Sequence, residues 1–379
     1  MARRIKILFG LEAGDAGALK HLVSLACGLD KIRFSITVIL STARSSRIFK
    51  EIDRMKMAGV NVLLFPMDKR IHITKDILLV LKLRAHLKEH KYDIVHAHSS
   101  KAGLTFRLAA RIAKIDTIIY TPHCFYFQSK SGVRRWFFSL AEKLLGIITT
   151  QLVVSCNEKD WALKHNLVSS DKLTVINNAI NNNDYQSNVS VQNIKKRLDI
   201  EDSHCIVGAV GRLCKQKDWT TFIYAAHQIL LQDKNVIFII AGDGELSIQL
   251  DNLITKLNIK QNVLLLGYVE EISNLYQIFD LFVSTSLWEG LPYTLLEAMY
   301  FNLPIVASDI GYGDVLVDNY NAVLFTPTDY KQLAVKIIKL IKNKSVRERI
   351  GQKSYQTFGN FKFSTFIEEH EKLYLSKLN

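Results

Sequence analysis

The runs CIVGAVG at 205–211 and VIFIIAGD at 236–243 decide the fold class of this 379-residue chain. Both runs are short and continuously apolar, which is typical of strands that are buried on both faces of a parallel sheet. A helical pattern separates them, and further runs of the same kind follow at 263–267, 281–286, 304–308 and 322–325. Strands that alternate with helices in this way predict a doubly wound α/β domain.

A second series of this kind precedes the first. Its apolar runs lie at 5–10, 34–40, 60–65, 92–98, 117–122, 151–156 and 172–177. Because a chain of this length exceeds the usual size of a single hydrophobic core, we predict two Rossmann-like doubly wound domains that face a central cleft. The expected segments are an N-terminal domain at 1–180, an Asn-rich polar linker at 181–203, a C-terminal domain at 204–360 and an amphipathic helix at 361–379.

Composition excludes several classes of protein. Hydrophobic residues make up 48% and charged residues 22% of the chain, which is typical of a globular protein and not of a disordered or fibrous one. The five cysteines are scattered and form no Cys-x-x-Cys pair, which favours a reducing compartment and argues against a disulfide framework. No signal peptide is recognisable, and no apolar stretch reaches the roughly 20 residues that span a bilayer. We therefore expect a cytoplasmic protein.

The excess of positive charge lies in the first half of the chain. Residues 1–185 contain 29 Lys and Arg against 15 Asp and Glu, a net charge of +14, whereas the remaining residues contain 20 and 21, a net charge of −1. Such asymmetry indicates an anionic partner for the first half, such as nucleic acid, an acidic membrane surface or a phosphorylated substrate. A surface that only confers solubility is the alternative.

The strongest motif for function is EGLPYTLLE at 289–297, directly after the apolar run at 281–286. Pro292 is typical of the first turn of a helix, and a helix N-terminus favours a phosphate group. Glu289 precedes this helix, and Glu297 lies about two turns into it. Carboxylates on both sides of a phosphate site suit a ligand with hydroxyl groups on either side of a diphosphate. Alternatively, both glutamates only complement the helix dipole, with well under ~1 kcal/mol each.

Two further loops after apolar runs combine glycine with charge. In GAVGRLCKQK at 208–217, Gly211 permits a sharp turn, and Arg212 and Lys217 can converge on a diphosphate and neutralise it without a metal ion. The loop AGDGEL at 241–246 follows the next run, and an ordinary tight turn explains it equally well.

The first half contributes a glycine-containing loop and two histidine-bearing segments. The loop EAGDAGALKH at 12–21 lacks the full Gly-x-Gly-x-x-Gly pattern, which argues against NAD binding. HAHSSK at 96–101 and TPHCFY at 121–126 lie where apolar runs end. Because no Cys, Asp or Glu stands near these histidines at ligand spacing, we expect no metal site. His123 can hydrogen-bond a sugar hydroxyl; a satisfied core histidine is the alternative.

Together these motifs resemble those of the GT-B retaining glycosyltransferases of family 4, the glycosyl transferases group 1, of the type that builds bacterial cell-surface polysaccharides. The resemblance covers essentially the whole chain. Its specific parts are the Glu289–Glu297 spacing and the loop from Gly211 to Lys217; GDG at 242–244, HSSKAG at 98–103 and TPH at 121–123 support them.

The resemblance implies a role for each matching residue. Glu297 would bind the ribose hydroxyls, Glu289 would hold hydroxyls of the donor sugar, and His123 would contact that sugar near its reacting face. Arg212 and Lys217 would grip the diphosphate. The catalytic residues would be His123, Arg212, Lys217 and Glu289, and the donor site would also include Gly17, Gly211, Gly242, Gly244, Gly290, Leu291 and Glu297. The terminal helix would cross back to the first domain.

The sequence also departs from the family pattern. Cys124 occupies the usual glycine after Thr-Pro-His, and Ala179 replaces a glycine that follows the run at 172–177. Cys124 adds a side chain beside the expected sugar site, so the donor sugar and the acceptor stay undetermined.

The resulting prediction is a retaining hexosyltransferase that needs no metal ion and no cofactor, because the nucleotide-sugar is its substrate. The expected acceptor is lipid-linked or a saccharide. A GT-B sugar-nucleotide 2-epimerase is one alternative, although the acidic residues that it needs cannot be identified. A basic nucleic-acid-binding protein is the other, but most aromatic residues fall within apolar runs and not among the basic ones.

The exception is Arg134-Arg135-Trp136-Phe137-Phe138, which is typical of a segment that binds a membrane surface. The basic helix expected around 75–91 could add to the same face. We therefore expect peripheral contact with an anionic membrane on its cytoplasmic side. The alternative is that the three aromatic side chains pack on the sheet.

Overall fold

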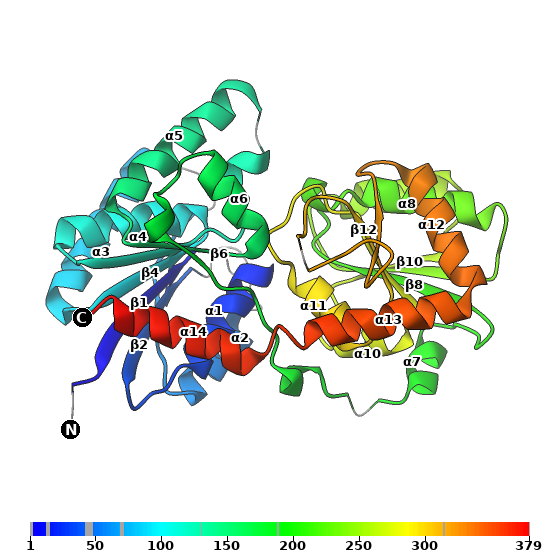
Figure 1. Cartoon of the computed structure of the whole chain (residues 1–379), viewed down its shortest axis with the longest axis horizontal. Helices are drawn as coiled ribbons and strands as arrows, with labels where there is room; N and C mark the ends of the chain where they lie inside the picture. Colours follow the sequence, from blue (N-terminus) through cyan, green and yellow to red (C-terminus); the bar gives the residue numbers. More distant parts are fainter. Residues whose placement is uncertain are drawn as a thin grey trace. The chain divides into compact units, whose positions relative to one another are not determined.

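The computed structural model describes residues 3–12, 16–41, 48–68, 72–129, 131–187, 189–313 and 315–378. The chain forms two compact units, which are considered separately (Figure 1). Unit 1 consists of Met1–Asn178 together with Phe363–Asn379, and unit 2 consists of Ala179–Lys362. Each unit is built around its own parallel sheet.

The described part of unit 1 contains a seven-stranded sheet in the order β3-β2-β1-β4-β5-β6-β7, with all neighbours parallel. Its strands are β1 (Ile5–Leu11), β2 (Phe34–Leu40), β3 (Asn61–Leu64), β4 (Ile94–His98), β5 (Thr117–Thr121), β6 (Gln151–Val154) and β7 (Leu173–Val175). β4 and β5 are buried along their length and β1 is buried from Ile7 to Leu11, as expected for a sheet with helices on both faces.

Helices cover this sheet on both sides (Figure 1). They are α1 (Ala16–Gly28), α2 (Ile48–Met57), α3 (Ile73–His90), α4 (Ser100–Ala113), α5 (Gly132–Ile148), α6 (Cys156–Lys164) and α14 (Phe363–Ser376), with short 3-10 turns at Tyr126–Ser129 and Ser170–Lys172. One apolar core joins α3, α4, α6 and Phe138 of α5 to the sheet. On the other side α14 packs on α1, where Gly28 leaves room for the Ile367 side chain. The terminal helix thus belongs to unit 1.

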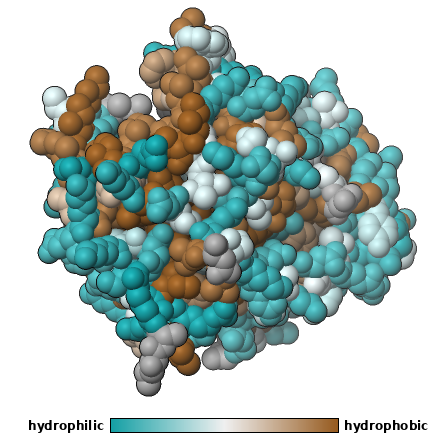
Figure 2. Space-filling model, turned by 60° about the vertical axis from the view of Figure 1, so that its left-hand side comes forward, coloured by the Kyte–Doolittle hydropathy of each residue, from teal (hydrophilic) through white to brown (hydrophobic). Residues whose placement is uncertain are grey.

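The outer surface of α5 is unusually apolar. Trp136 is 64% exposed and Phe137 is 60% exposed. Val133, Leu144 and Ile147 are exposed as well, and Arg134 and Arg135 lie among them. Figure 2 shows apolar surface in the upper part of this face of unit 1, where α5 lies.

The described part of unit 2 contains a six-stranded parallel sheet in the order β10-β9-β8-β11-β12-β13. Its strands are β8 (Cys205–Val210), β9 (Val236–Ala241), β10 (Val263–Gly267), β11 (Leu281–Ser284), β12 (Ile305–Ser308) and β13 (Val323–Phe325). Its helices are α7 (Val191–Arg197), α8 (Trp219–Leu230), α9 (Ser247–Lys256), α10 (Ile272–Ile278), α11 (Tyr293–Tyr300), α12 (Tyr330–Lys342) and α13 (Lys344–Phe358), with 3-10 turns at Asn182–Tyr185 and Lys215–Lys217.

The predicted fold class of two doubly wound α/β domains is confirmed. The segment 181–203, expected to be a linker, instead belongs to unit 2 and contains α7. Buried Tyr185 and Ile194 anchor this segment in the unit, which its polar composition conceals. Among the described residues, no helix is both long and apolar enough to cross a membrane.

Both sheets reverse their strand order at one place, between β1 and β4 in unit 1 and between β8 and β11 in unit 2. In open parallel sheets, ligands bind outside the carboxyl ends of the strands at such a switch point. The residues singled out in the sequence follow β1, β4 and β5 in unit 1, and β8, β9 and β11 in unit 2. Each unit therefore gathers its own set of candidate residues.

Candidate functional site

In unit 2, two glycine loops pack tightly against each other beyond the ends of β8 and β9. The backbone N–H of Gly211 donates to Ala241 O at 2.9 Å. Gly242 has a φ of +148°, and a Cβ there would lie 1.9 Å from Gly211 O. A Cβ on Gly244 would lie 2.4 Å from Leu213 O. Gly242 and Gly244 are therefore required by backbone contact alone, in addition to any part they take in binding a ligand.

The cationic loop after β8 meets the glutamate of the strongest sequence motif. Lys217 Nζ lies 2.7 Å from Glu289 Oε1, with 15% and 10% of the two side chains exposed. Ser286 Oγ donates to the same carboxylate oxygen at 2.9 Å. Lys217 is thus fixed at the switch point by a largely buried ion pair.

One side-chain and one backbone hydrogen bond hold this loop and the motif together. Gln216 Nε2 donates to Trp288 O at 2.7 Å, and Leu287 N donates to Gln216 O at 2.8 Å. Arg212 is exposed, and its carbonyl accepts from Trp219 Nε1 at 2.9 Å. The guanidinium of Arg212 therefore lies at the solvent-facing edge of the arrangement, whereas Lys217 lies inside it.

The N-terminus of α11 lies directly after this ion pair. Pro292 is the residue before the helix, with φ −72° and ψ 137°, one position earlier than the first-turn place that the sequence suggested. Gly290 and Leu291 are buried on the approach to it. A helix N-terminus carries partial positive charge and favours an anion. The Lys217–Glu289 ion pair and the N-terminus of α11 thus lie at the same end of β11.

Glu297 is buried among tyrosines. Its Oε1 accepts a hydrogen bond from Tyr185 Oη at 2.8 Å, and its Oε2 accepts one from Tyr276 Oη at 2.7 Å. Burial, and then the neighbouring carboxylate, raise the pKa of Tyr185 and of Tyr276, so both hydroxyls stay protonated and donate. A carboxylate has about four acceptor positions, and the two tyrosine hydroxyls occupy two of them. Sequence reasoning identified neither tyrosine, because nothing in the local pattern links positions 185 and 276 to 297.

In unit 1 the chain turns through an unusual backbone conformation after β5. His123 has a φ of +53° and Cys124 a φ of +82°, a region that favours glycine. The buried Glu158 accepts from Cys124 N at 2.7 Å through Oε1 and from Ser155 N at 3.0 Å through Oε2. Glu158 thereby fixes the turn that carries His123. The Ser-x-x-Glu pattern at 155–158 is a sequence signal that identifies this glutamate as a helix-capping residue.

The two histidines of the segment 96–98 have different surroundings. His96 Nδ1 is 2.8 Å from Tyr374 Oη, and His96 Nε2 is 2.8 Å from Thr121 Oγ1, so His96 is a satisfied core histidine. His98 Nδ1 lies 3.1 Å from His123 Nε2, and its own Nε2 is buried without a hydrogen-bond partner among the described residues.

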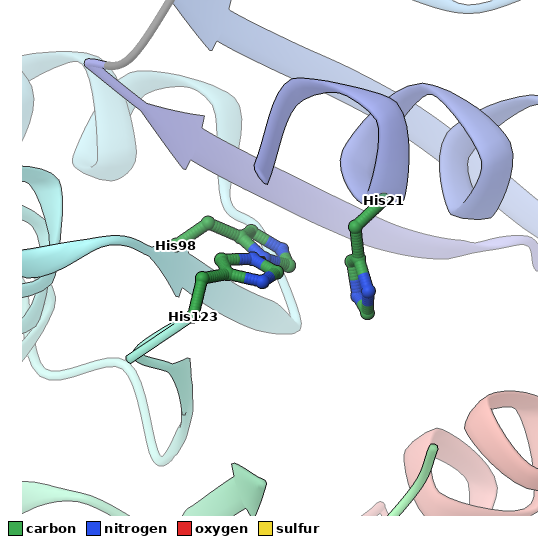
Figure 3. Close-up of side chains that lie close together, drawn as sticks. All are labelled: His21, His98 and His123. Carbon is green, nitrogen blue, oxygen red and sulfur yellow. The ribbon is translucent and has the colours of Figure 1, made fainter. Parts of the chain in front are cut away.

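A third histidine, which the sequence did not single out, completes a cluster. His21 of α1 faces His98 and His123, whose side chains lie side by side at the ends of neighbouring strands (Figure 3). His21 Nδ1 is 2.8 Å from Asn178 Oδ1. Gly17, which the resemblance places beside the phosphates, lies in the first turn of the same helix and is partly exposed.

Comparison with known proteins gives the family of both halves. Residues 190–357 match the family model described as "Glycosyl transferases group 1", and residues 16–184 match the one described as "Glycosyltransferase Family 4". An Escherichia coli protein named UDP-Gal:alpha-D-GlcNAc-diphosphoundecaprenol alpha-1,3-galactosyltransferase is 35% identical over 66% of this chain and 66% of its own. The capsular polysaccharide biosynthesis glycosyltransferase CapM of Staphylococcus aureus is 27% identical over 82% of this chain and 83% of its own.

Among solved structures, the Anabaena protein Alr3699/HepE, crystallised with UDP and glucose, superposes with a TM-score of 0.84. The two sequences are 22% identical, and the superposition covers 98% of this chain and 100% of that one. This similarity supports the fold.

Proposed function

Since the chain belongs to the group 1 glycosyltransferases and is a glycosyltransferase of cell-surface polysaccharide synthesis, we propose that it transfers a sugar from a nucleotide-sugar with retention of anomeric configuration and without a metal ion. The comparisons support neither an epimerase nor a nucleic-acid-binding protein. The observation that carries the proposal is the Lys217–Glu289 ion pair of 2.7 Å, beside the N-terminus of α11.

The first part of the proposed mechanism concerns the leaving group. Transfer breaks the bond between the sugar and a diphosphate, so negative charge develops on the departing oxygen. A preformed cation in a largely buried site stabilises such charge strongly, because water does not screen it. Lys217 supplies that cation, Arg212 adds a planar fork at the exposed edge, and the α11 N-terminus adds its dipole. With three sources of positive charge, no divalent ion is required.

The second part concerns the two glutamates. Glu289 fixes Lys217 and has a second carboxylate oxygen for a donor-sugar hydroxyl. Glu297 holds the ribose hydroxyls, beside the hydrogen bonds that it accepts from Tyr185 and Tyr276. In this arrangement, the loops of unit 2 that contain Gly211, Gly242, Gly244, Gly290 and Leu291 bring backbone close to the nucleotide. For His123 and Gly17 of unit 1 we propose the donor-binding roles that the resemblance implies.

The substrates follow from the Escherichia coli relative, whose name specifies a UDP-sugar and a sugar carried on a lipid diphosphate. We take a UDP-hexose as the donor and a lipid-diphosphate-linked sugar as the acceptor. Nucleotide-sugars of this kind carry the hexose in α linkage, so an α-linked product means retention.

An anionic membrane surface suits such an acceptor. On α5, Trp136 and Phe137 are exposed beside Arg134 and Arg135. Of the three adjacent aromatic residues, Phe138 packs on the core. The alternative that these side chains pack on the sheet therefore applies to Phe138 and not to the other two. α3 packs on the same core and exposes further apolar and basic side chains. Aromatic residues favour the headgroup boundary, and each Lys or Arg near an anionic leaflet contributes ~1 kcal/mol. We propose that this face of unit 1 binds the membrane.

A thermal-shift panel tests the choice of donor. UDP and UDP-hexoses should raise the unfolding temperature, whereas the corresponding GDP, dTDP and CMP compounds should not, because only the preferred nucleotide gains binding energy in the folded state. A response to GDP-sugars alone would refute the UDP assignment. No response to any nucleotide-sugar would refute the proposed donor site.

A further inference from the structure

We propose that His21, His98 and His123 form a binding site for a divalent transition-metal ion, typified by Zn²⁺, and that the bound ion inhibits sugar transfer. One nitrogen atom from each ring lies within 4.8 Å of the others. The rings converge from three separate elements, α1 and the ends of β4 and β5 (Figure 3). Because His21 is remote in sequence, the spacing of 96–101 and 121–126 could not reveal this set.

The distances suit metal ligation after a small adjustment. In a tetrahedral zinc site with Zn–N bonds of about 2.0–2.1 Å, ligand nitrogens lie about 3.3 Å apart. His98 Nδ1 and His123 Nε2 are already 3.1 Å apart. His21 must approach the pair, because the three ligand nitrogens lie within 4.8 Å of one another and not yet at the spacing of a bound ion. Three histidines with one remaining position are a familiar ligand set for Zn²⁺.

The hydrogen bonds leave lone pairs for an ion. An amide oxygen only accepts, so the contact with Asn178 Oδ1 assigns the proton of His21 to Nδ1 and leaves a lone pair on Nε2. His21 Nε2 is buried and has no hydrogen-bond partner among the described residues. A histidine whose second nitrogen donates to a fixed acceptor is the usual arrangement around a bound metal.

The charge state of the rings agrees with this geometry. Burial lowers the pKa of His21 to about 4 and the pKa of His98 well below its ordinary value. Both rings are therefore neutral at pH 7, as metal ligation requires.

The inhibitory effect rests on the proposed function, in which His123 contacts the donor sugar. His123 is the one partly exposed member of the cluster. An ion that binds His123 occupies its Nε2 and draws the ring towards His21, so the ring no longer meets the sugar. Transfer itself uses Lys217 and Arg212 in unit 2 and does not require this ion.

The test uses the full-length, tag-free protein after treatment with a chelating resin. Co²⁺ is titrated in, and the visible absorption bands of low-symmetry Co²⁺ are recorded; Zn²⁺ is then added as a competitor. We expect one equivalent of Co²⁺ to bind and Zn²⁺ to displace it. His21→Gln and His98→Gln should each weaken Co²⁺ binding at least about 10-fold, and Asn178→Ala about 10-fold through loss of ring orientation. His227→Gln in unit 2 is the matched control and should bind like the wild type.

Transfer activity with and without Zn²⁺ is measured on the same proteins, with circular dichroism as a check of folding. Zn²⁺ should inhibit the wild type and His227→Gln but not His21→Gln. Equal Co²⁺ binding by the wild type, His21→Gln and His98→Gln, or no Co²⁺ bands in the wild type, would overturn the site and leave the proposed function untouched. Site-specific binding without inhibition would overturn the inhibitory role and count against contact between His123 and the donor sugar. If the wild type binds no Co²⁺ and Lys217→Ala still abolishes transfer, the error lies in the metal inference alone.

Discussion

The switch points of the two units share a topology and differ in charge. At the ends of β4 and β5 in unit 1, His98 and His123 are neutral rings whose pKa values burial holds well below the ordinary value. At the ends of β8 and β11 in unit 2, Lys217 and Glu289 form a largely buried ion pair. The same parallel-sheet geometry thus supports two different chemistries, because the loops and not the strands supply the side chains.

In the proposed mechanism the two switch points differ in role. A diphosphate needs fixed positive charge, for which we propose Lys217 and the α11 N-terminus of unit 2. For the buried rings of unit 1 we propose hydrogen bonding to neutral hydroxyl groups. The net charge of +14 in residues 1–185 includes exposed side chains away from these buried rings, such as Arg134 and Arg135 on α5.

Removing the cation of unit 2 should have the largest effect. We expect Lys217→Ala, and likewise Arg212→Ala, to lower kcat by 10²-fold or more, on the order of the loss of one oxyanion-stabilising donor. The control is Lys215→Ala, which removes an exposed charge from the same loop. Steady-state transfer assays on folded variants measure the effect. Wild-type turnover in Lys217→Ala would refute the proposed role of Lys217 and, with it, the contrast in charge between the two units.

Acid should destabilise unit 1 before unit 2. The folded pKa of His21, about 4, lies below its unfolded value of 6.5, so between these values the unfolded chain binds a proton that the folded chain does not. The free energy of unfolding therefore falls as the pH falls from 6.5 to 4, by about 3 kcal/mol for His21. Burial lowers the pKa of His370 to about 3, which acts in the same direction.

Hydrogen exchange with mass spectrometry separates the two units in this experiment. On chelator-treated protein, peptides from β4 and α14 should lose protection between pH 7 and pH 5, after correction for intrinsic exchange, while peptides from β8 and β9 keep theirs. Equal protection of unit 1 at both pH values would contradict the account of its buried rings.

Much of this contrast could be predicted from the sequence, because strands and their following loops are local patterns. The parallel strands, the loop from Gly211 to Lys217 and the motif at 289–297 are all contiguous. The partners that complete each set are not. Tyr185 meets Glu297 only because the segment 181–203, misread as a linker, folds into unit 2.

Unit 1 illustrates the same limit. His21 lies in an ordinary helical pattern and joins His98 only through the packing of α1 on the sheet. The prediction that no metal ligand stands near 96–101 considered sequence neighbours alone. Long-range packing therefore determines what local spacing cannot show.

The charge on the outside of unit 1 leads to a membrane test. Sedimentation with liposomes should give binding that grows with anionic lipid content and falls with salt. Arg134→Glu/Arg135→Glu should weaken it by about 1 kcal/mol or more for each residue. Lys195→Glu/Lys196→Glu in α7 of unit 2 is a charge-matched control. Absence of binding to any liposome at low salt would rule out the membrane face and point to a soluble acceptor.

The two glutamates of unit 2 should separate binding from transfer. Both carboxylate oxygens of Glu297 accept a hydrogen bond from a tyrosine hydroxyl. In Glu297→Gln an NH₂ group replaces one of these oxygens and cannot accept that bond. We expect the ribose site to distort and UDP to bind about 10-fold more weakly. Glu289→Gln should spare UDP binding and lower transfer. Calorimetry with UDP measures both, and the opposite ranking would require the two roles to be exchanged.

The smallest expected effect concerns the turn that carries His123. Cys124 has a φ of +82°, which costs a residue with a side chain about 1–2 kcal/mol, whereas glycine loses about 0.5–1 kcal/mol in conformational entropy. Cys124→Gly should therefore stabilise the protein by up to about 1 kcal/mol, visible as a rise of a few degrees in Tm. Cys124→Ala, which keeps the strain, is the control. A lower Tm for Cys124→Gly than for Cys124→Ala would show that the turn is not strained.

The central claim is that cationic side chains of unit 2, and no metal ion, support a retaining transfer. The most direct test incubates the chelator-treated enzyme with a UDP-hexose and a lipid-diphosphate-linked sugar in excess EDTA, and determines the anomeric configuration of the product by NMR. The account predicts full turnover in EDTA and an α-linked product from the α-linked donor. A β-linked product, or activity that EDTA abolishes and Mn²⁺ or Mg²⁺ restores, would contradict it.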